Sequence, residues 1–326
     1  MTAIDTWHAP RKDTLVSTEP FFPPEGITTF ARSPLARSGD PIAADVVVLG
    51  VPWDGGTGLR GGARHGPRAI REASLRCPLW ADGQPTGYWD VAAERRMLAG
   101  VRVVDLGDLA VVRASQERTV AAIEAAARRA RGGGALLATL GGYHSIAYPL
   151  VRACDDCANL GIIQLDAHLD FADDVQGVRI SSSSPLRRIS ELPFVGPMAA
   201  IGLRGLRTDP AAFAAARNRG NALITRAALR ESGPAAVVAS LPAMQQIYLT
   251  LDIDVLDPTL APGASAPELD GLRYDELREL LRAIARHGRV VGIDVVEVSP
   301  PLDPAGTTAL AAAQALVELL AAVFER

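Results

Sequence analysis

The sequence predicts an α/β fold in which eight mainly parallel strands form a sheet covered by helices on both faces. From residue 45 onward, short apolar runs that resemble strands alternate with longer segments of helical periodicity, an order typical of parallel sheets. The apolar runs are rich in β-branched residues and do not alternate with polar ones, as expected of strands buried on both faces. The 326 residues, 48% of them hydrophobic, supply a core large enough for one such domain.

The predicted elements follow one another along the chain in near alternation. Strands are expected at 45–51, 101–106, 135–140, 159–165, 197–203, 221–225, 246–252 and 289–296, and helices at 67–75, 115–131, 145–154, 209–218, 273–287 and 305–324. The helix at 273–287 is the clearest, because aliphatic residues from Leu277 to Ile284 recur at helical spacing. We expect Asp270 or Gly271 to open this helix and Gly288 to stand just after its end.

The first 40 residues are expected to form an N-terminal extension, rich in Pro, Thr and Ser, ahead of a single domain at 41–326. The extension has no long apolar segment, so we expect neither a signal peptide nor a transmembrane helix, and a cytoplasmic location. The net charge of −4, without a basic cluster, argues against nucleic acid and anionic membranes as partners. The expected partner is a small molecule.

The strand predicted at 159–165 is followed by polar residues in an unusual arrangement. Asp166, His168 and Asp170 occupy alternating positions, so that their side chains would share one side of an extended chain. Two carboxylates and an imidazole that converge on one point form half of a metal site. Such a motif alone is more often a capping or surface feature, but unpaired carboxylates at the end of a buried strand would be costly.

Two further strand ends carry candidate ligands. The strand at 246–252 leads to Asp252 and Asp254, and the strand at 135–140 runs into a Gly-rich turn that contains His144. Because ligands bind beyond the carboxyl ends of parallel strands, we expect these side chains to meet those of the first motif. Six N and O ligands without a thiolate favour a pair of harder divalent ions over one structural zinc. Such a pair can activate a bridging water at neutral pH, which predicts hydrolysis.

A series of segments resembles the arginase/agmatinase (ureohydrolase) family. It consists of Gly-Val-Pro-Trp-Asp-Gly-Gly-Thr at 50–57, Gly-Ala-Arg-His-Gly-Pro-Arg-Ala-Ile-Arg at 62–71, and then the three metal segments in order. The resemblance covers about 45–324 and implies a three-layer αβα sandwich on an eight-stranded sheet. It also implies two Mn²⁺ ions per chain, with Ni²⁺ as an alternative, and a homotrimer or homohexamer. The implied ligands are all present: His144, Asp166, His168, Asp170, Asp252 and Asp254.

The resemblance further implies a substrate and a reaction. Glu297 matches the carboxylate that binds the guanidinium of the substrate, and a carboxylate can accept two parallel hydrogen bonds from this planar cation. The expected activity is agmatinase-like urea release by hydrolysis of a C–N bond in a guanidino or amidino compound. A metal-bridging hydroxide is the expected nucleophile, and Asp170 is expected among the catalytic residues. The alternative is a non-catalytic member that keeps its metals for stability and serves as a binding or assembly subunit.

The chain departs from the family pattern near the expected catalytic site. Ser182 stands where the family has a histidine thought to shuttle a proton to the leaving amine, and serine cannot titrate near neutral pH. Tyr143 replaces an aspartate beside the first metal-binding histidine, so we expect it to alter how His144 is oriented, and its hydroxyl is a candidate proton donor. The chain is therefore predicted to be an atypical member of the family.

Two loops are expected to select the tail of the substrate. One follows Asp170, and the other spans 77–95 and contains several aromatic residues. In the first loop, Asp173 and Asp174 would attract an amine, whereas Arg179 would attract a carboxylate. The sequence therefore leaves the chemistry of the tail open.

Overall fold

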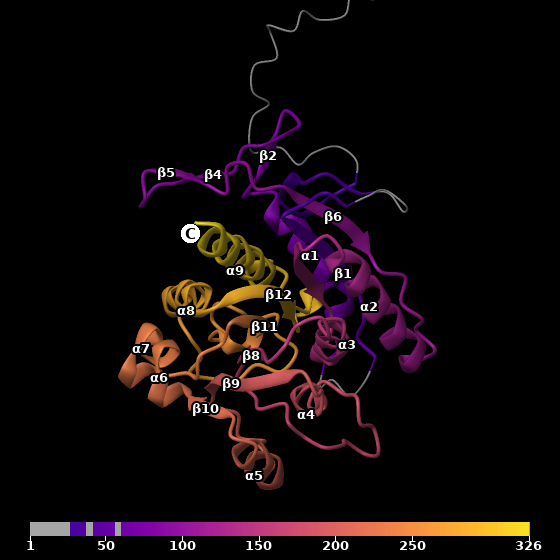
Figure 1. Cartoon of the computed structure of the whole chain (residues 1–326), viewed down its shortest axis with the longest axis vertical. Coiled ribbons are helices and arrows are strands. Elements are labelled where there is room, and N and C mark those ends of the chain that lie inside the picture. Colours follow the sequence, from indigo (N-terminus) through magenta and orange to yellow (C-terminus); the bar gives the residue numbers. More distant parts are fainter. Residues whose placement is uncertain (1–26, 37–41, 56–59, 326) are drawn as a thin grey trace, which may run out of the picture.

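The centre of the protein is a single eight-stranded sheet (Figure 1). The structure is a computed structural model that describes residues 27–36, 42–55 and 60–325. The strands are β1 (Val46–Val51), β6 (Val103–Asp108), β7 (Leu136–Gly141), β8 (Leu160–Leu165), β9 (Val195–Leu203), β10 (Ala222–Thr225), β11 (Gln246–Asp252) and β12 (Arg289–Val296). They lie in the order β10-β9-β8-β11-β12-β7-β1-β6, and every neighbouring pair is parallel. The predicted fold class and all eight predicted strands are confirmed.

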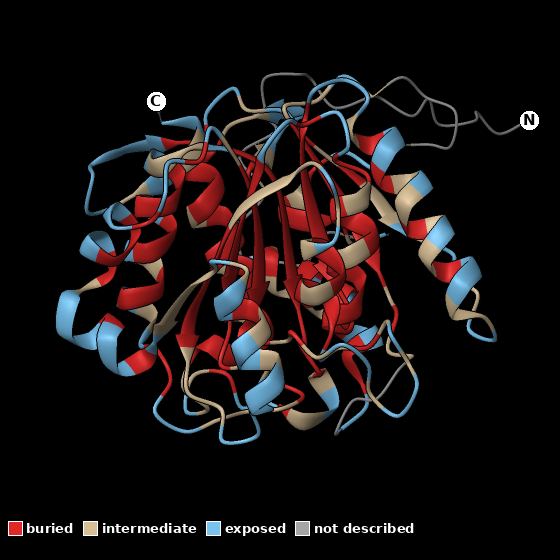
Figure 2. Ribbon diagram, turned by 60° about the horizontal axis from the view of Figure 1, so that its bottom comes forward, coloured by how far each residue is buried: buried red, intermediate tan, exposed pale blue. Residues whose placement is uncertain are grey.

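Alternate side chains along each strand enter two separate hydrophobic cores, which is why the strands are apolar throughout. In β1, Val46 and Val48 face one core, whereas Val47 and Leu49 face the other. Helices α1 (Gly66–Ser74), α6 (Arg226–Ser232), α7 (Pro234–Ala239), α8 (Tyr274–His287) and α9 (Thr307–Phe324) cover the first core, and α2 (Gln116–Arg131), α3 (Ala147–Arg152), α4 (Pro185–Ser190) and α5 (Pro210–Asn218) cover the second. Figure 2 shows the buried strands between the helices of this three-layer sandwich.

Several helices differ from the prediction. The sequence pattern misses α4, α6 and α7, which have only six or seven residues each, too few for the helical period to stand out. Helix α8 does not open at Asp270 or Gly271. Its N-cap is Arg273, whose backbone N–H donates to Glu276 Oε2 at 2.8 Å. The acceptor comes from inside the helix, so the preceding residues gave no sign of it.

Gly288 follows α8 as expected, but for a different reason from the one that the pattern suggests. Its φ of −164° is extended, not left-handed. A Cβ at this position would lie 2.1 Å from the backbone oxygen of Met244, so the close approach of another segment requires glycine here.

Helix α9 is apolar enough and, with 18 residues, long enough to cross a membrane by composition alone. In the structure 61% of that stretch is buried, and the helix packs against α8 and α1 on the face of the sheet that borders the first core. These contacts explain its composition as that of a core helix.

Residues 27–36 belong to the domain, although the sequence places them in an extension. Phe30 is fully buried in the first core, and its backbone N–H donates to Asp105 Oδ2 at 2.8 Å. The backbone N–H of Ala31 donates to Ser74 Oγ at 2.8 Å. The buried side chains of Phe30 and Ala31, together with these two hydrogen bonds, hold the segment against the domain on the N-terminal side of the predicted boundary at residue 41. Parts of two predictions lie outside the described residues. They are 1–26 and 37–41, which belong to the expected extension and domain boundary, and Gly56 and Thr57 of the first family segment.

The segment between α1 and β6 forms two short hairpins that the sequence did not predict. They are β2–β3 (Trp80–Ala81 and Gln84–Pro85) and β4–β5 (Tyr88–Asp90 and Arg95–Met97). Arg95 pairs with Glu325 at 2.7 Å, beside the end of α9 (Figure 1). Because a helix that follows a parallel strand returns the chain to the amino ends of the sheet, these hairpins lie at the end opposite the ligand side.

Candidate metal centre

Four consecutive strands in the middle of the sheet present polar side chains beyond their carboxyl ends. In sheet order these strands are β8, β11, β12 and β7. The sequence suggested that three adjacent strands carry the ligands, but β12 lies between β11 and β7. It brings Glu297, which directly follows it, into the same cluster, since the Glu297 Oε1 atom accepts the backbone N–H of His144 at 2.7 Å.

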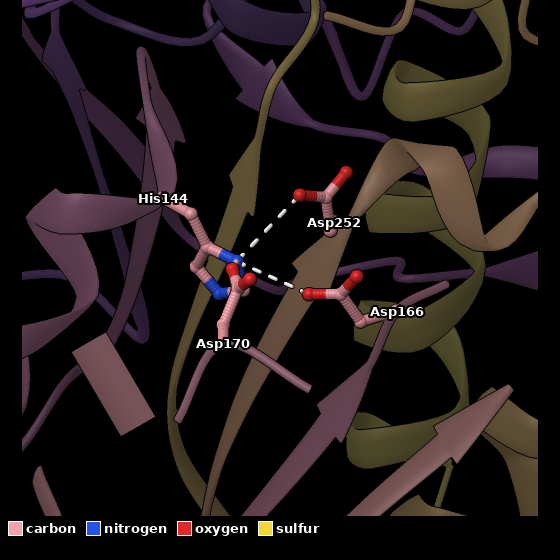
Figure 3. Close-up of side chains that lie close together, drawn as sticks. All are labelled: His144, Asp166, Asp170 and Asp252. Atoms are coloured by element: carbon pink, nitrogen blue, oxygen red, sulfur yellow. Dashed lines mark ion pairs between the residues drawn. The ribbon is translucent and has the colours of Figure 1, made fainter. Parts of the chain in front are cut away.

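The first group of donors surrounds His144. Its Nδ1 atom lies 2.9 Å from Asp170 Oδ2, 3.2 Å from Asp166 Oδ2 and 3.6 Å from Asp252 Oδ2. Figure 3 shows these four side chains converging from separate segments. Their ligand atoms all lie within 4.8 Å of one another, which is compatible with a single metal ion.

The second group surrounds His168 and shares one member with the first. His168 Nδ1 lies 3.0 Å from Asp254 Oδ2 and 3.5 Å from Asp166 Oδ1. Asp166 thus directs one oxygen toward each group and could bridge two ions. All six ligands named by the sequence motifs are brought together in these two groups.

The side chains converge through turns, and not only through strand alternation as the sequence suggested. Strand β8 ends at Leu165, and the backbone bends before Asp170, whose φ of +48° is in the left-handed region. Asp254 lies on a 3₁₀ turn, Ile253–Val255, and its backbone N–H donates to Asp252 Oδ1 at 2.9 Å. These local bonds leave the second oxygen of Asp252 free to face the cluster.

A chain of hydrogen bonds behind His144 sets which of its ring nitrogens faces the cluster. Thr250 Oγ1 donates to Asp294 Oδ1 at 2.6 Å, so it can only accept the bond at 2.9 Å from His144 Nε2. Nε2 therefore carries a proton. Asp294 also accepts from Tyr248 at 2.8 Å, and burial raises its pKa to about 6. Sequence reasoning missed this chain, although an acidic residue within a buried apolar strand was a visible signal.

The surroundings of His144 Nδ1 give the clearest evidence that a cation binds here. It is fully buried and has no hydrogen-bond partner among the described residues, yet three carboxylates face it. Burial disfavours a charged ring, but the nearby carboxylates of Asp166 and Asp170 overcome this and raise the pKa of His144 well above its usual value. A positive charge is needed at this point, and a divalent ion would supply it while accepting the Nδ1 lone pair.

The carboxylates themselves are crowded and buried. Burial and the charges of Asp254 and Asp166 raise the pKa of Asp252 well above its usual value. Burial and the charge of Asp166 raise the pKa of Asp170 to about 6. Without cations these groups would repel one another, and two divalent ions would balance the four aspartates. The donor set therefore fits a binuclear centre of hard or borderline ions.

Two residues that the sequence motifs did not name support the second group. Glu268 Oε1 lies 3.2 Å from His168 Nε2, which leaves Nδ1 of that ring for a metal. The guanidinium of Arg204 donates to the backbone oxygens of Asp254 at 2.6 Å and Glu268 at 3.0 Å. Arg204 thereby joins the two loops that carry these carboxylates.

A cavity of about 160 Å³ opens onto the cluster. Its wall is formed by residues from the two metal groups, from the loop after β8 and from the loop between β9 and α5. The lining residues include Asp170, Ser182, Ser183, Arg207, Asp209, Ala212 and Glu297. Glu297 has a φ of +65°, an uncommon conformation outside glycine, so the backbone is held in a strained state where it presents this carboxylate. Burial raises the pKa of Glu297 to about 7.

Some expected pocket residues lie elsewhere. Among the described residues that line the cavity, none comes from 77–95. Tyr143 is buried outside the cavity, and its hydroxyl donates to the backbone oxygen of Arg60 at 3.1 Å. Arg179 lies 3.7 Å from Asp173 in an exposed ion pair. The prediction that the loop at 77–95 selects the tail of the substrate is thus wrong, because this loop lies at the end of the sheet opposite the cavity.

The fold and the donor set together define an α/β protein with a candidate binuclear metal centre. Residues 44–322 match the model of the arginase family, and the chain belongs to this family. A guanidinopropionase of Pseudomonas aeruginosa is 36% identical over 306 residues, which cover 92% of each chain. An agmatinase of Halalkalibacterium halodurans is 32% identical over 279 residues, covering 84% of this chain and 90% of that one. The solved structure of proclavaminate amidinohydrolase from Streptomyces clavuligerus matches with a TM-score of 0.77 and 30% identity, covering 91% of this chain and 97% of that one.

These relationships place the protein among the amidinohydrolases, enzymes that hydrolyse C–N bonds of guanidino compounds. The cluster of aspartates and histidines could hold the metal ions of such an enzyme.

Proposed function

We propose that the protein is a urea-releasing amidinohydrolase of a small guanidino compound, dependent on two Mn²⁺ ions, with Ni²⁺ as the alternative metal. The observation that carries this proposal is the balance of charge in the site. Two divalent ions neutralise Asp166, Asp170, Asp252 and Asp254, and the charge of Glu297 then remains. A substrate guanidinium matches that charge.

Each part of the cavity has a role in this reaction. A pair of divalent ions supplies a nucleophilic oxygen from water at neutral pH and polarises the group under attack. Glu297 holds one edge of the guanidinium through charge-assisted hydrogen bonds, with its Oε1 atom already fixed by the His144 N–H. Asp170, in its left-handed conformation, lines the same wall and directs Oδ2 toward His144 Nδ1. Glu297 would thereby orient the guanidinium toward the side chains that would hold the metals.

The leaving amine must gain a proton, and Ser182 is the residue placed to matter here. It lines the cavity beside Ser183, on a turn that is closed by the bond from the Ser181 N–H to Ser184 Oγ at 2.9 Å. A serine hydroxyl does not titrate near neutral pH, so we infer that water delivers this proton and that plain guanidines react slowly. Tyr143 receives no role as a donor, because its hydroxyl is directed to Arg60.

Glu297→Gln tests the proposed binding of the guanidinium. Loss of a charged hydrogen-bond partner is worth roughly 1.5–3 kcal/mol, so kcat/KM for urea release should fall by roughly 10- to 100-fold. Two bound metals per chain should remain. The control is Glu191→Gln, which changes the exposed carboxylate that follows α4 and pairs with Arg188 outside the cavity.

The substrates for this test are arginine, agmatine, 4-guanidinobutyrate and 3-guanidinopropionate, each with the Mn²⁺-loaded and the Ni²⁺-loaded enzyme. If no compound yields urea from a fully loaded enzyme, the proposed function is wrong. If Glu297→Gln retains full activity, the proposed role of this carboxylate is wrong.

A further inference from the structure

Arg207 lies at the mouth of the cavity, on the loop between β9 and α5. Among the described residues that line the cavity, it is the only arginine or lysine. Its side chain is 54% exposed, and its carboxylate partner, Glu268, lies 3.5 Å from Nε. An ion pair this long and this exposed is weak. The guanidinium is therefore available to an anion that enters the cavity.

The tautomer of His168 that would bind a metal leaves Arg207 without a hydrogen bond to this ring. One Arg207 nitrogen lies 3.0 Å from His168 Nε2, and Glu268 Oε1 lies 3.2 Å from the same atom. When Nδ1 of His168 is a ligand, Nε2 carries the ring proton and donates to Glu268. Two donors cannot bond to each other, so Arg207 gains no hydrogen bond from His168. Its N–H groups remain for a ligand.

Charge along the cavity runs from carboxylates at its floor to Arg207 at its mouth. Two carboxylates oppose Arg207 here. One is Glu268, and the other is Asp209, whose Oδ1 atom caps α5 by accepting the Ala211 N–H at 3.0 Å. The amino end of α5 reaches the cavity at Ala212, and the positive end of a helix dipole adds to the attraction of an anion. A molecule with a cationic head and an anionic tail matches this arrangement.

We propose that Arg207 binds the carboxylate of a short guanidino acid and makes the enzyme prefer acid-tailed over amine-tailed substrates. This inference rests on the proposed function, because Glu297 must hold the guanidinium at the other end. The substrate is short for two reasons. Arg207 contacts a residue that is itself a metal ligand, and the cavity of about 160 Å³ is smaller than the roughly 300–1,000 Å³ of sites for drug-sized ligands.

The test compares 4-guanidinobutyrate with agmatine, which has an amine in place of the carboxylate. Wild type should show the higher kcat/KM with 4-guanidinobutyrate. Arg207→Met should lower that value by roughly 10- to 100-fold, the loss expected for a charge-assisted hydrogen bond, and leave agmatine unchanged or improved. Arg207→Glu should invert the preference. Arg179→Met is the matched control, because Arg179 is similarly exposed, at 64%, but does not line the cavity.

Binding is measured separately from turnover. Calorimetric titration of the metal-loaded enzyme with 4-aminobutyrate and with 1,4-diaminobutane should show tighter binding of the acid, lost in Arg207→Met and kept in Arg179→Met. Metal content of each variant is checked by elemental analysis. Urea release that favours agmatine in wild type, or a preference that Arg207→Met leaves unchanged, would overturn the role of Arg207 and leave the proposed function standing. Absence of urea release from both compounds would instead overturn the proposed function on which this inference rests.

Discussion

The hydrogen-bond chain behind His144 can be broken with almost no change in shape by Thr250→Val. Thr250 is fully buried, and it accepts from His144 Nε2 at 2.9 Å while donating to Asp294 Oδ1 at 2.6 Å. Valine removes both bonds. The imidazole then loses the partner that orients its Nδ1 atom toward Asp166, Asp170 and Asp252. Loss of such a supporting group typically costs 10- to 100-fold in metal affinity, or about 1.4–2.8 kcal/mol.

The chain offers a matched control for this substitution. Thr139 is an equally buried strand threonine, and its Oγ1 atom has no hydrogen-bond partner among the described residues. Thr139→Val should therefore leave metal affinity unchanged and should not lower the free energy of unfolding, since no bond is lost. Both variants are titrated with Mn²⁺ in competition with a chromophoric chelator. Equal affinities in Thr250→Val and wild type would show that Thr250 does not orient the metal ligand.

Two further predictions concern the metals and the missing histidine. Asp166 belongs to both ligand groups, so Asp166→Asn should weaken the binding of both ions. Asp254 belongs to one group, so Asp254→Asn should weaken the binding of one ion. Elemental analysis of Asp254→Asn should then find about one metal ion per chain. Ser182→His restores a group that titrates near neutral pH at the cavity wall, so kcat for a plain guanidine should rise by up to ~10²–10⁴-fold. Ser183→His, one residue away, is the control for the position of the new histidine. If wild type already hydrolyses such substrates fast and Ser182→His slows it, another acid protonates the leaving amine.

The side chains that meet in the two donor groups could be predicted because the evidence for them is local. Each ligand group directly follows an apolar strand, and the carboxyl ends of parallel strands form one edge of the sheet. Asp166 and Asp252 are therefore recognisable from a few neighbouring residues each. The positions of the strands could be predicted for the same reason, since strands buried on both faces, such as β8 and β11, must be apolar along their whole length.

Contacts between distant segments could not be predicted from the neighbouring residues in the sequence. The position of β12 between β11 and β7 is a matter of sheet topology, and it alone puts Glu297 next to His144. The burial of Phe30 depends on a hydrogen bond to Asp105, 75 residues away. Neither contact leaves a periodic trace in the sequence around the residues that make it.

The sequence by itself determined the sandwich, and it named the six residues that the structure brings together in the two donor groups. The lack of a proton-shuttling histidine at Ser182 stays a prediction. Only the tertiary structure decided which residues surround the substrate. It excluded the loop at 77–95, because the helix before that loop returns the chain to the far end of the sheet, and it brought Arg207 to the cavity from the loop between β9 and α5. The difference has a physical cause: burial constrains every residue of a strand, whereas a cavity is formed by loops whose meeting depends on the order of the strands beneath them.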